Sequence, residues 1–527
     1  MSRVTSTPRA HRRGALFAEE RLSARGRRLT AFALLAATAT LPACAEILGL
    51  EPPGSGTGGS GNTTQTGGNG GSGGTGANGG SGGTAGAGGT GGIGTGEILA
   101  VEIFSAPGSN DLRDVAIGPD GEVYVTGTYT GTTSFRDCPL PTVGSLATFL
   151  VKLTPDLDCT WVATASTTGT QVSFSRIALR NKEVWVIGSG DGYIDLFTNG
   201  GIPTIEAQGT DALILGFAED STILQAYRIG GSGNEYGTAI AAGDHIYGLF
   251  EGIGGGTITA SLNGAPAMDY SPSFGGIDGV LLGIEPQGLL FTWPFGSSED
   301  DAARSLAVVN DRIAIGGQIG GGADLNTDCK QGRSDEKLAF AFDFDQAGTP
   351  GPTALCDAFG GFGPSYTTDL AAGPGGAFAM AGVSFGPTDL GCTAGGVVGA
   401  NKAWLRRGKD ATSCISAELL AGPEESSGGG VLWAGDTLYF GGTFTGTLEG
   451  TKGQGSDVFV RRYAGETAEL LWSRGFGSTG TETFSGFAVS PEDGTTLVVG
   501  SCNGSDFAGT ARPCSSDGDG YLVRLGP

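Results

Sequence analysis

A strand-like apolar pattern recurs seven times after residue 97, and this internal repeat constrains the fold more than any other feature of the sequence. In each copy two or three apolar residues stand together, as in Val123-Tyr124-Val125, and successive copies are 59 to 67 residues apart. Seven copies at a near-constant spacing indicate a repeat architecture. The central residues of the seven copies are Tyr124, Trp185, Tyr247, Ala314, Ala379, Tyr439 and Val498.

Each copy contains three further strand-like segments. A short strand comes before the central one, and polar turns such as Gly118-Pro119-Asp120-Gly121 predict a hairpin between them. A third strand follows about 20 to 30 residues later, and then a fourth, as at Leu470-Leu471-Trp472. Four antiparallel strands per repeat make one propeller blade. With 101 Gly among 527 residues the chain cannot be mostly helical, so we predict an all-β fold, a seven-bladed β-propeller of four-stranded antiparallel blades over residues 97–527.

The last copy lacks a fourth strand, because the sequence ends at Pro527 directly after its third. The missing strand is predicted at the other end of the repeat region, since residues 98–104 are followed by a turn like the one after residues 289–295. The ring would then be closed 3+1 by an N-terminal strand, with no free blade edge.

The N-terminal part predicts export and anchoring. Residues 1–43 combine eight arginines with an apolar run too short to span a bilayer, which is typical of a signal peptide. The run ends in Leu41-Pro42-Ala43-Cys44, which resembles the lipobox of bacterial lipoproteins, so Cys44 is the expected lipidation site. Residues 44–96 are rich in Gly, Ser and Thr and predict a disordered Gly-rich tether. Ala45-Glu46 lacks the aspartate that retains many such lipoproteins at the inner membrane, so we expect an outer-membrane or cell-surface location.

The charge limits the partners. The formal net charge is −24 and the isoelectric point about 4.4, which argues against a nucleic-acid binder. We expect a monomer without a cofactor that meets the membrane only through its lipid.

Several short segments resemble a known repeat family. Tyr124-Val125-Thr126-Gly127, Asp457-Val458-Phe459-Val460 and residues 230–235 are similar to the bacterial seven-bladed propeller repeats called SBBP, which occur in exported surface proteins. The resemblance covers residues 97–527. It departs from the pattern at Ala147-Thr148 and Lys402-Ala403, where the family has an Asp before the third strand. The resemblance implies the propeller fold and says little about function.

The cysteines follow the repeat. Apart from Cys44 there are eight, an even number that favours disulfides in an exported chain. Copies 1, 4 and 5 each have one cysteine after the second strand and one near the fourth, and copy 7 has two before its third strand, so bonds within a blade are expected. A metal site would need closely spaced cysteines or histidines, and His245 is the only histidine left after signal cleavage. The predicted pairs are Cys138–Cys159, Cys329–Cys356, Cys392–Cys414 and Cys502–Cys514.

The remaining candidate residues have structural interpretations that we prefer. His245 begins a strand, residues 490–497 resemble an Asp box whose role is itself structural, and Asp517 with Asp519 form only a fragment of a calcium loop. A set of acidic residues stands before third strands, where Asp side chains accept backbone N–H bonds, and three tryptophans on fourth strands are expected to pack between blades. The acidic set is Asp211, Asp278, Asp457 and Asp519, and the tryptophans are Trp161, Trp293 and Trp472.

Two functions remain open. The first is a non-catalytic cell-surface lipoprotein whose propeller binds a protein or a glycan. The alternative is a glycan-active hydrolase or lyase on the same scaffold. A single histidine and the lack of a recurrent acid pair outside the repeat register favour the first, so no catalytic residue is predicted.

Overall fold

The computed structural model describes residues 95–527, apart from 200–202, 232, 254–255, 261–267, 271–275, 286–287, 297–298, 310–311, 321–337, 346–355, 362, 387, 391, 393–400, 410–413, 421–422, 449–450, 454 and 511–512. The described residues belong to one compact unit, Gly88–Pro527. The predicted signal peptide, the lipidation site Cys44, most of the linker and Cys329 lie outside the described residues.

The described chain is all-β. Its helical segments are two 3-10 turns of three residues each, Pro374–Gly376 and Phe507–Gly509. The strands form because short apolar runs alternate with turns rich in Gly, Pro and Asp, which punctuate strands and favour hairpins. In the chain's first complete sheet, the order is β2 (Asp111–Ile117), β3 (Val123–Gly131), β6 (Val143–Leu153) and β7 (Cys159–Thr167), each antiparallel to the next.

The same four-stranded antiparallel order recurs along the chain. The following sheets are β8 (Val172–Arg180), β9 (Glu183–Phe197), β10 (Thr204–Phe217) and β11 (Ile223–Gly231); β12 (Glu235–Ala242), β13 (Ile246–Ile253), β16 (Ile277–Glu285) and β17 (Gly288–Phe295); β18 (Ala302–Val309), β19 (Arg312–Ile319), β20 (Leu338–Asp345) and β21 (Cys356–Gly361); β22 (Ser365–Ala372), β23 (Phe378–Ser384), β25 (Lys402–Gly408) and β26 (Ser416–Leu419); and β27 (Ser426–Ala434), β28 (Thr437–Phe444), β31 (Asp457–Ala464) and β32 (Leu470–Phe476).

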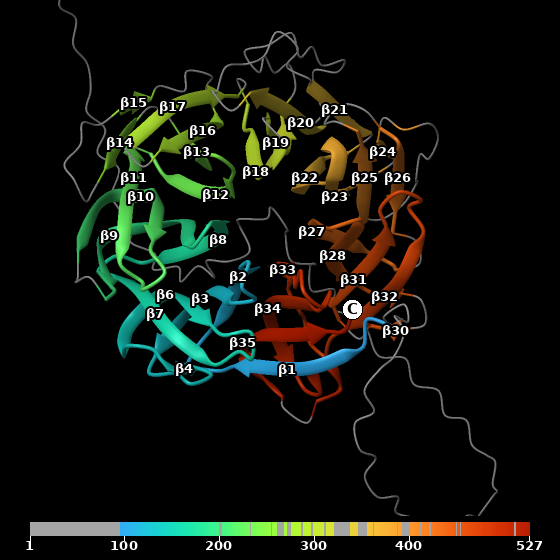
Figure 1. The fold of residues 1–527 in the computed structure, drawn as a ribbon, viewed down its shortest axis with the longest axis horizontal. Coiled ribbons are helices and arrows are strands. Elements are labelled where there is room, and N and C mark those ends of the chain that lie inside the picture. The colour runs from blue at the N-terminus through green and yellow to red at the C-terminus, as the bar shows by residue number, and fades with distance from the viewer. Residues whose placement is uncertain are drawn as a thin grey trace, which may run out of the picture. The chain divides into compact units, whose positions relative to one another are not determined.

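The last sheet draws on both ends of the described chain. It contains β33 (Gly486–Val489), β34 (Thr496–Gly504), β35 (Cys514–Leu525) and, as its outer strand, β1 (Ile98–Phe104). β1 runs antiparallel to β35, with Val101 opposite Val523 and Ile103 opposite Tyr521. Figure 1 shows β1 in blue along the outside of the red β34 and β35.

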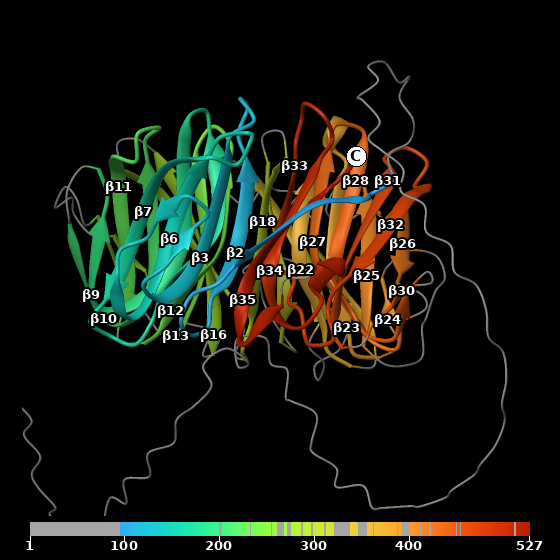
Figure 2. The same cartoon turned by 90° about the horizontal axis from the view of Figure 1, so that it is seen from below.

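The sheets stand around a common axis as the blades of a β-propeller (Figure 1), and Figure 2 shows the strands running along that axis. The first strand of each sheet faces the axis, and we call these seven segments the inner strands. Each inner strand lies beside the inner strands of two other sheets, in the cyclic order β2, β8, β12, β18, β22, β27, β33 and back to β2.

The core lies between neighbouring sheets. One cluster joins Trp185, Ile187 and Ile214 of the second sheet to Phe250 and Leu282 of the third. Its members are buried, so their apolar area is removed from water at a seam between blades. Burial at seams explains why the apolar runs recur at the period of the blade.

Short segments after the second strands cover the outer edges of neighbouring sheets. β14 (Gly256–Ala260) pairs with β11, β24 (Thr388–Asp389) pairs with β21, and the end of β9 pairs with β7. Pairing satisfies edge N–H and C=O groups that would otherwise be free to bind other chains. The other short strands are β4 (Ser134–Phe135), β5 (Cys138–Pro139), β15 (Met268–Tyr270), β29 (Thr447–Leu448) and β30 (Thr451–Lys452).

Three of the expected disulfides lie within the described residues. The Cα atoms are 5.3 Å apart in Cys138–Cys159, 5.2 Å in Cys392–Cys414 and 5.8 Å in Cys502–Cys514. Each bond stays within one repeat, so these three pairings are confirmed, whereas the fourth includes Cys329. Disulfides indicate an extracellular or periplasmic protein. Along the described chain, no helix has the length and apolarity to cross a membrane.

Candidate functional site

The inner strands carry a repeated irregularity where they face the axis. In six of them the register with the second strand shifts by one residue, as between Leu112 and Asp114 of β2. Such a β-bulge re-aims the residue that follows it. We call the residues directly after these shifts the post-bulge residues, and they are Asp114, Arg176, Ala239, Ser305, Asp369 and Gly430.

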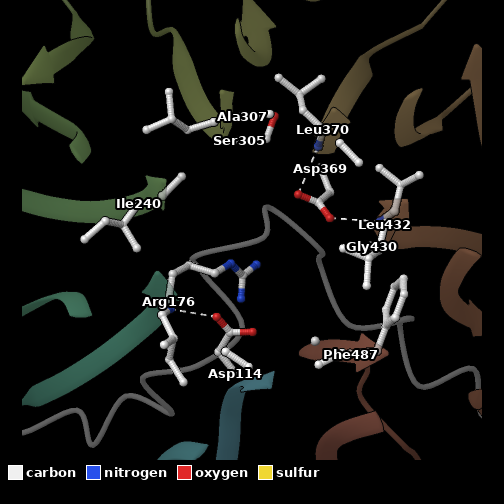
Figure 3. A pocket seen from close by; sticks show the side chains of 18 of the residues that line it. Asp114, Arg176, Ile240, Ser305, Ala307, Asp369, Leu370, Gly430, Leu432 and Phe487 are labelled. Atoms are coloured by element: carbon white, nitrogen blue, oxygen red, sulfur yellow. Dashed lines mark hydrogen bonds between the residues drawn. The ribbon is translucent and has the colours of Figure 1, made fainter. Parts of the chain in front are cut away.

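The post-bulge residues line a cavity of about 440 Å³ on the axis. Figure 3 shows the charged side chains of Asp114, Arg176 and Asp369 at this cavity. Apolar side chains complete the wall, among them Ile240, Leu370, Leu432 and Phe487. The cavity therefore combines a few charges with apolar surface, as ligand sites do.

Asp114 ties two blades together. Its Oδ1 accepts the N–H of Val115 at 2.9 Å in its own strand, and its Oδ2 accepts the N–H of Ile177 at 2.8 Å in the next inner strand. The close approach requires a glycine on the other side, because a Cβ at Gly486 would lie 2.5 Å from Oδ1.

Asp369 repeats this arrangement in another part of the ring. Its Oδ1 accepts the N–H of Leu370 at 2.9 Å, and its Oδ2 accepts the N–H of Val431 at 2.8 Å in the next inner strand. The two carboxylates occupy the same register position in copies 1 and 5, and they make equivalent bonds.

Burial dominates the electrostatics of both carboxyls. It raises the pKa of Asp114 and of Asp369 from 3.8 to about 6, and Arg176 and the backbone N–H groups oppose the rise. Each group is still largely ionised at pH 7 and becomes protonated in mild acid.

Arg176 links the second copy of the repeat to the first and the last. Its Nη1 donates to the carbonyl oxygens of Ser485 at 3.0 Å, Ser175 at 3.3 Å and Arg113 at 3.4 Å. It therefore joins the inner strand β8 to the segment before β33. A second guanidinium, that of Arg304, also lines the cavity, and its Nε lies 3.6 Å from Oε1 of Glu251.

The acidic residues predicted before third strands lie within those strands, in β10, β16, β31 and β35, and none of them lines this cavity. Asp211 is fully buried, accepts the N–H of Gln208 at 3.1 Å and pairs with Arg228 at 2.8 Å. Asp519 accepts the N–H of Ser515 at 2.7 Å. The expected backbone bonds are confirmed for these two residues, and the Arg228 ion pair was not anticipated.

Asp457 shares its site with a second acid that the sequence did not suggest. The buried side chain of Glu482 is hydrogen-bonded to it. Burial and the Asp457 carboxyl raise the pKa of Glu482 to about 7, against the bonds that Ser478 donates to it. The hydrogen bond between the two carboxyls joins the strand β31 to the segment that leads to β33, and their proximity favours the protonated form of Glu482.

The other predicted residues have structural partners. His245 stands before β13, with Nδ1 3.7 Å from Oε1 of Glu285. Thr495 donates its N–H to Asp493 at 3.0 Å, so the segment that resembles an Asp box forms a hairpin turn. Trp161 packs between Tyr124 of its own blade and Phe217 of the next, which confirms its expected role.

Asp517 and Asp519, which resemble a fragment of a calcium loop, are not part of a complete set of calcium ligands among the residues described. Asp519 is engaged by Ser515, and Asp517 accepts from Ser516 at 3.4 Å. Within the described ranges, no group of three or more His, Cys, Asp or Glu side chains is placed to hold a metal ion. The partly buried Trp293 and the buried Trp472 belong to clusters that join adjacent sheets.

The axial charges were missed by the sequence reasoning, although the sequence carries a signal for two of them. Asp114-Val115-Ala116 and Asp369-Leu370-Ala371 repeat the same acid-apolar-alanine pattern at the same position before the central strand. Arg176 has no such counterpart, and only the fold brings it to the cavity.

Comparisons with known proteins give no family. No family model matches the chain, and no curated protein matches it. Among solved structures, it is similar to U3-55K, with 8% identity over 82% of this chain and 100% of that one and a TM-score of 0.39. It is also similar to YCF48 bound to D1 peptide, with 8% identity over 83% and 100% and a TM-score of 0.38. A third is the β-propeller domain of the Trilobed protease from Pyrococcus furiosus, with 7% identity over 74% and 88% and a TM-score of 0.37.

Proposed function

We propose that this chain is a non-catalytic, exported lipoprotein that presents a seven-bladed β-propeller for binding a protein or a glycan. The ring is closed 3+1, with β1 as the fourth strand of the last blade. The cyclic order of the inner strands and the pairing of β1 with β35 support this architecture. The disulfides support export, and the sequence around Cys44 supports a lipid anchor followed by a tether.

One observation carries the non-catalytic part of the proposal: both carboxylates at the axis, and the guanidinium of Arg176, are bound to the backbone. Asp114 and Asp369 each accept two N–H groups, and Arg176 donates to three carbonyl oxygens. A carboxylate fixed by N–H bonds from two blades holds those blades in register. It is poorly suited to change partners during a reaction, because each displaced bond leaves a buried N–H group unsatisfied.

A glycan-active enzyme is the second candidate, and the two axial carboxyls favour it. Asp114 and Asp369 face one cavity, and the pKa of each is raised to about 6. Paired carboxyls are the groups that glycosidases use as acid and as base or nucleophile. Cleavage of a glycan would support the enzyme, whereas binding of a glycan without cleavage would support the first candidate.

Binding can be tested on the mature chain with two probes. The chain is applied to a glycan array, and it is cross-linked on intact cells, with an unrelated protein of equal net charge as the control for non-specific acidic contacts. We expect retention of a defined glycan or a single cross-linked protein that the control does not give. If neither probe is retained above the control, the binding proposal is wrong.

A further inference from the structure

The axial cavity presents charges of both signs, and the carboxylate of Asp114 on β2 lies beside the Arg176 guanidinium. Arg176 enters it from β8, and Asp369 lies on the wall formed by β22 (Figure 3). Apolar side chains also line the cavity, among them Leu370, Leu432 and Phe487. We propose that this cavity binds a small zwitterion, namely a free α-amino acid with a large apolar side chain.

The carboxylate end of such a ligand is matched by Arg176. Within the described residues, the hydrogen bonds of this guanidinium all come from Nη1. A guanidinium has five N–H donors in a planar fork, so Nε and Nη2 remain to receive a carboxylate in the bidentate way that arginine favours. The guanidinium of Arg304 on the same cavity adds to the positive potential, although the carboxylates of Glu251 and Asp114 offset part of it.

The ammonium end is matched by Asp369. Each oxygen of this carboxylate accepts one backbone N–H, and a carboxylate oxygen can accept two bonds. Its remaining lone pairs are therefore available to an ammonium group. The backbone bonds fix the carboxylate in place, so the acceptor is oriented before the ligand arrives.

The apolar body of the ligand is matched by the wall and by the size of the cavity. Phe487 occupies space that glycine leaves open, because a Cβ at Gly430 would lie 2.8 Å from its ring. The volume of about 440 Å³ is at the small end of the range for ligand sites, roughly 300 to 1,000 Å³, and so suits one amino acid with its hydration. This site is distinct from the surface contact of the proposed function.

The test titrates the mature chain with L-leucine and L-phenylalanine by calorimetry, and then with derivatives that lack one charge. N-acetyl-phenylalanine lacks the cation, and phenylalanine amide lacks the anion. We expect one of the free amino acids to bind and each blocked derivative to bind about tenfold more weakly or worse. Equal affinity for the free and blocked forms, or no binding of either amino acid at about 10 mM, would overturn the proposal.

Variants assign each charge to its residue. Arg176→Gln should remove the preference for the free acid over the amide, and Asp369→Asn should remove the preference for the free amine over the N-acetyl form. Arg180→Gln is the matched control, since Arg180 ends the same strand but pairs with Glu183 at 2.8 Å. If Asp369→Asn fails to fold, the proposal is still tested by the affinities of the wild-type chain for the free and blocked amino acids, and by the same affinities of Arg176→Gln. Retention of both preferences by Arg176→Gln would assign the binding elsewhere and refute this site.

Discussion

Replacing Phe104 by alanine should destabilise the domain strongly, because this residue fixes β1 against the first blade. Its side chain is 4% exposed, and its ring lies 5.3 Å from that of Phe149 and 5.5 Å from that of Phe135. Removing a buried phenylalanine costs about 3 to 5 kcal/mol. The matched control is Leu99→Ala, on the same strand, whose side chain is 49% exposed.

The expected shift in melting temperature follows from the size of the domain. For roughly 430 residues the unfolding entropy is about 0.9 kcal/mol/K, so Phe104→Ala should lower the melting temperature by about 3 to 6 °C. Leu99→Ala should lower it by less than about 1 °C, since exposed substitutions stay within about 0.5 kcal/mol. Differential scanning calorimetry of both variants measures the two shifts in melting temperature. Equal, small shifts would show that β1 is not packed against the first blade, and would refute the placement of β1 on which the 3+1 closure depends.

Three further predictions concern protons, disulfides and the anchor. Because the pKa of Glu482 is raised from 4.5 to about 7, the folded state holds more protons in that window, so stability should fall as pH rises from 4.5 to 7. Urea unfolding at several pH values should show this slope. Glu482→Gln should make it shallower, most clearly between pH 6 and 7, because Asp114 and Asp369 contribute a slope of the same sign up to about pH 6. A Cys138→Ser/Cys159→Ser double variant should lose about 3 kcal/mol by the chain-entropy model, measured by urea unfolding; no loss would contradict a stabilising role for this bond. Mass spectrometry of the mature N-terminus should find a diacylated Cys44, and an unmodified Cys44 within a longer chain would end the lipoprotein hypothesis.

The architecture was accessible from sequence because each blade repeats the same local chemistry. Apolar strand centres such as Val123-Tyr124-Val125, and turns such as Gly118-Pro119-Asp120-Gly121, specify hairpins without reference to the rest of the chain. The disulfide pairs were also accessible, since cysteines that appear together in a repeat lie close in its blade.

The cavity was harder to predict from the sequence, because its geometry depends on bulges and on contacts between blades. Nothing local to Arg176 indicates that it reaches Ser485, which is more than 300 residues away in the chain. Likewise, Glu482 comes close to Asp457 only once the strand β31 and the segment before β33 are packed together. Local sequence propensities do not encode contacts between residues so far apart in the chain, so the candidate site could be identified only from the fold.

The central claim is that the axial carboxylates hold blades together and do not carry out catalysis. The most direct test measures the release of new reducing ends from a panel of polysaccharides by the wild-type chain and by Asp369→Asn, with exposed Asp436→Asn as the control. The account predicts no release by any of the three proteins. Release by the wild type and by Asp436→Asn that Asp369→Asn abolishes would contradict it and would favour the glycan-active alternative.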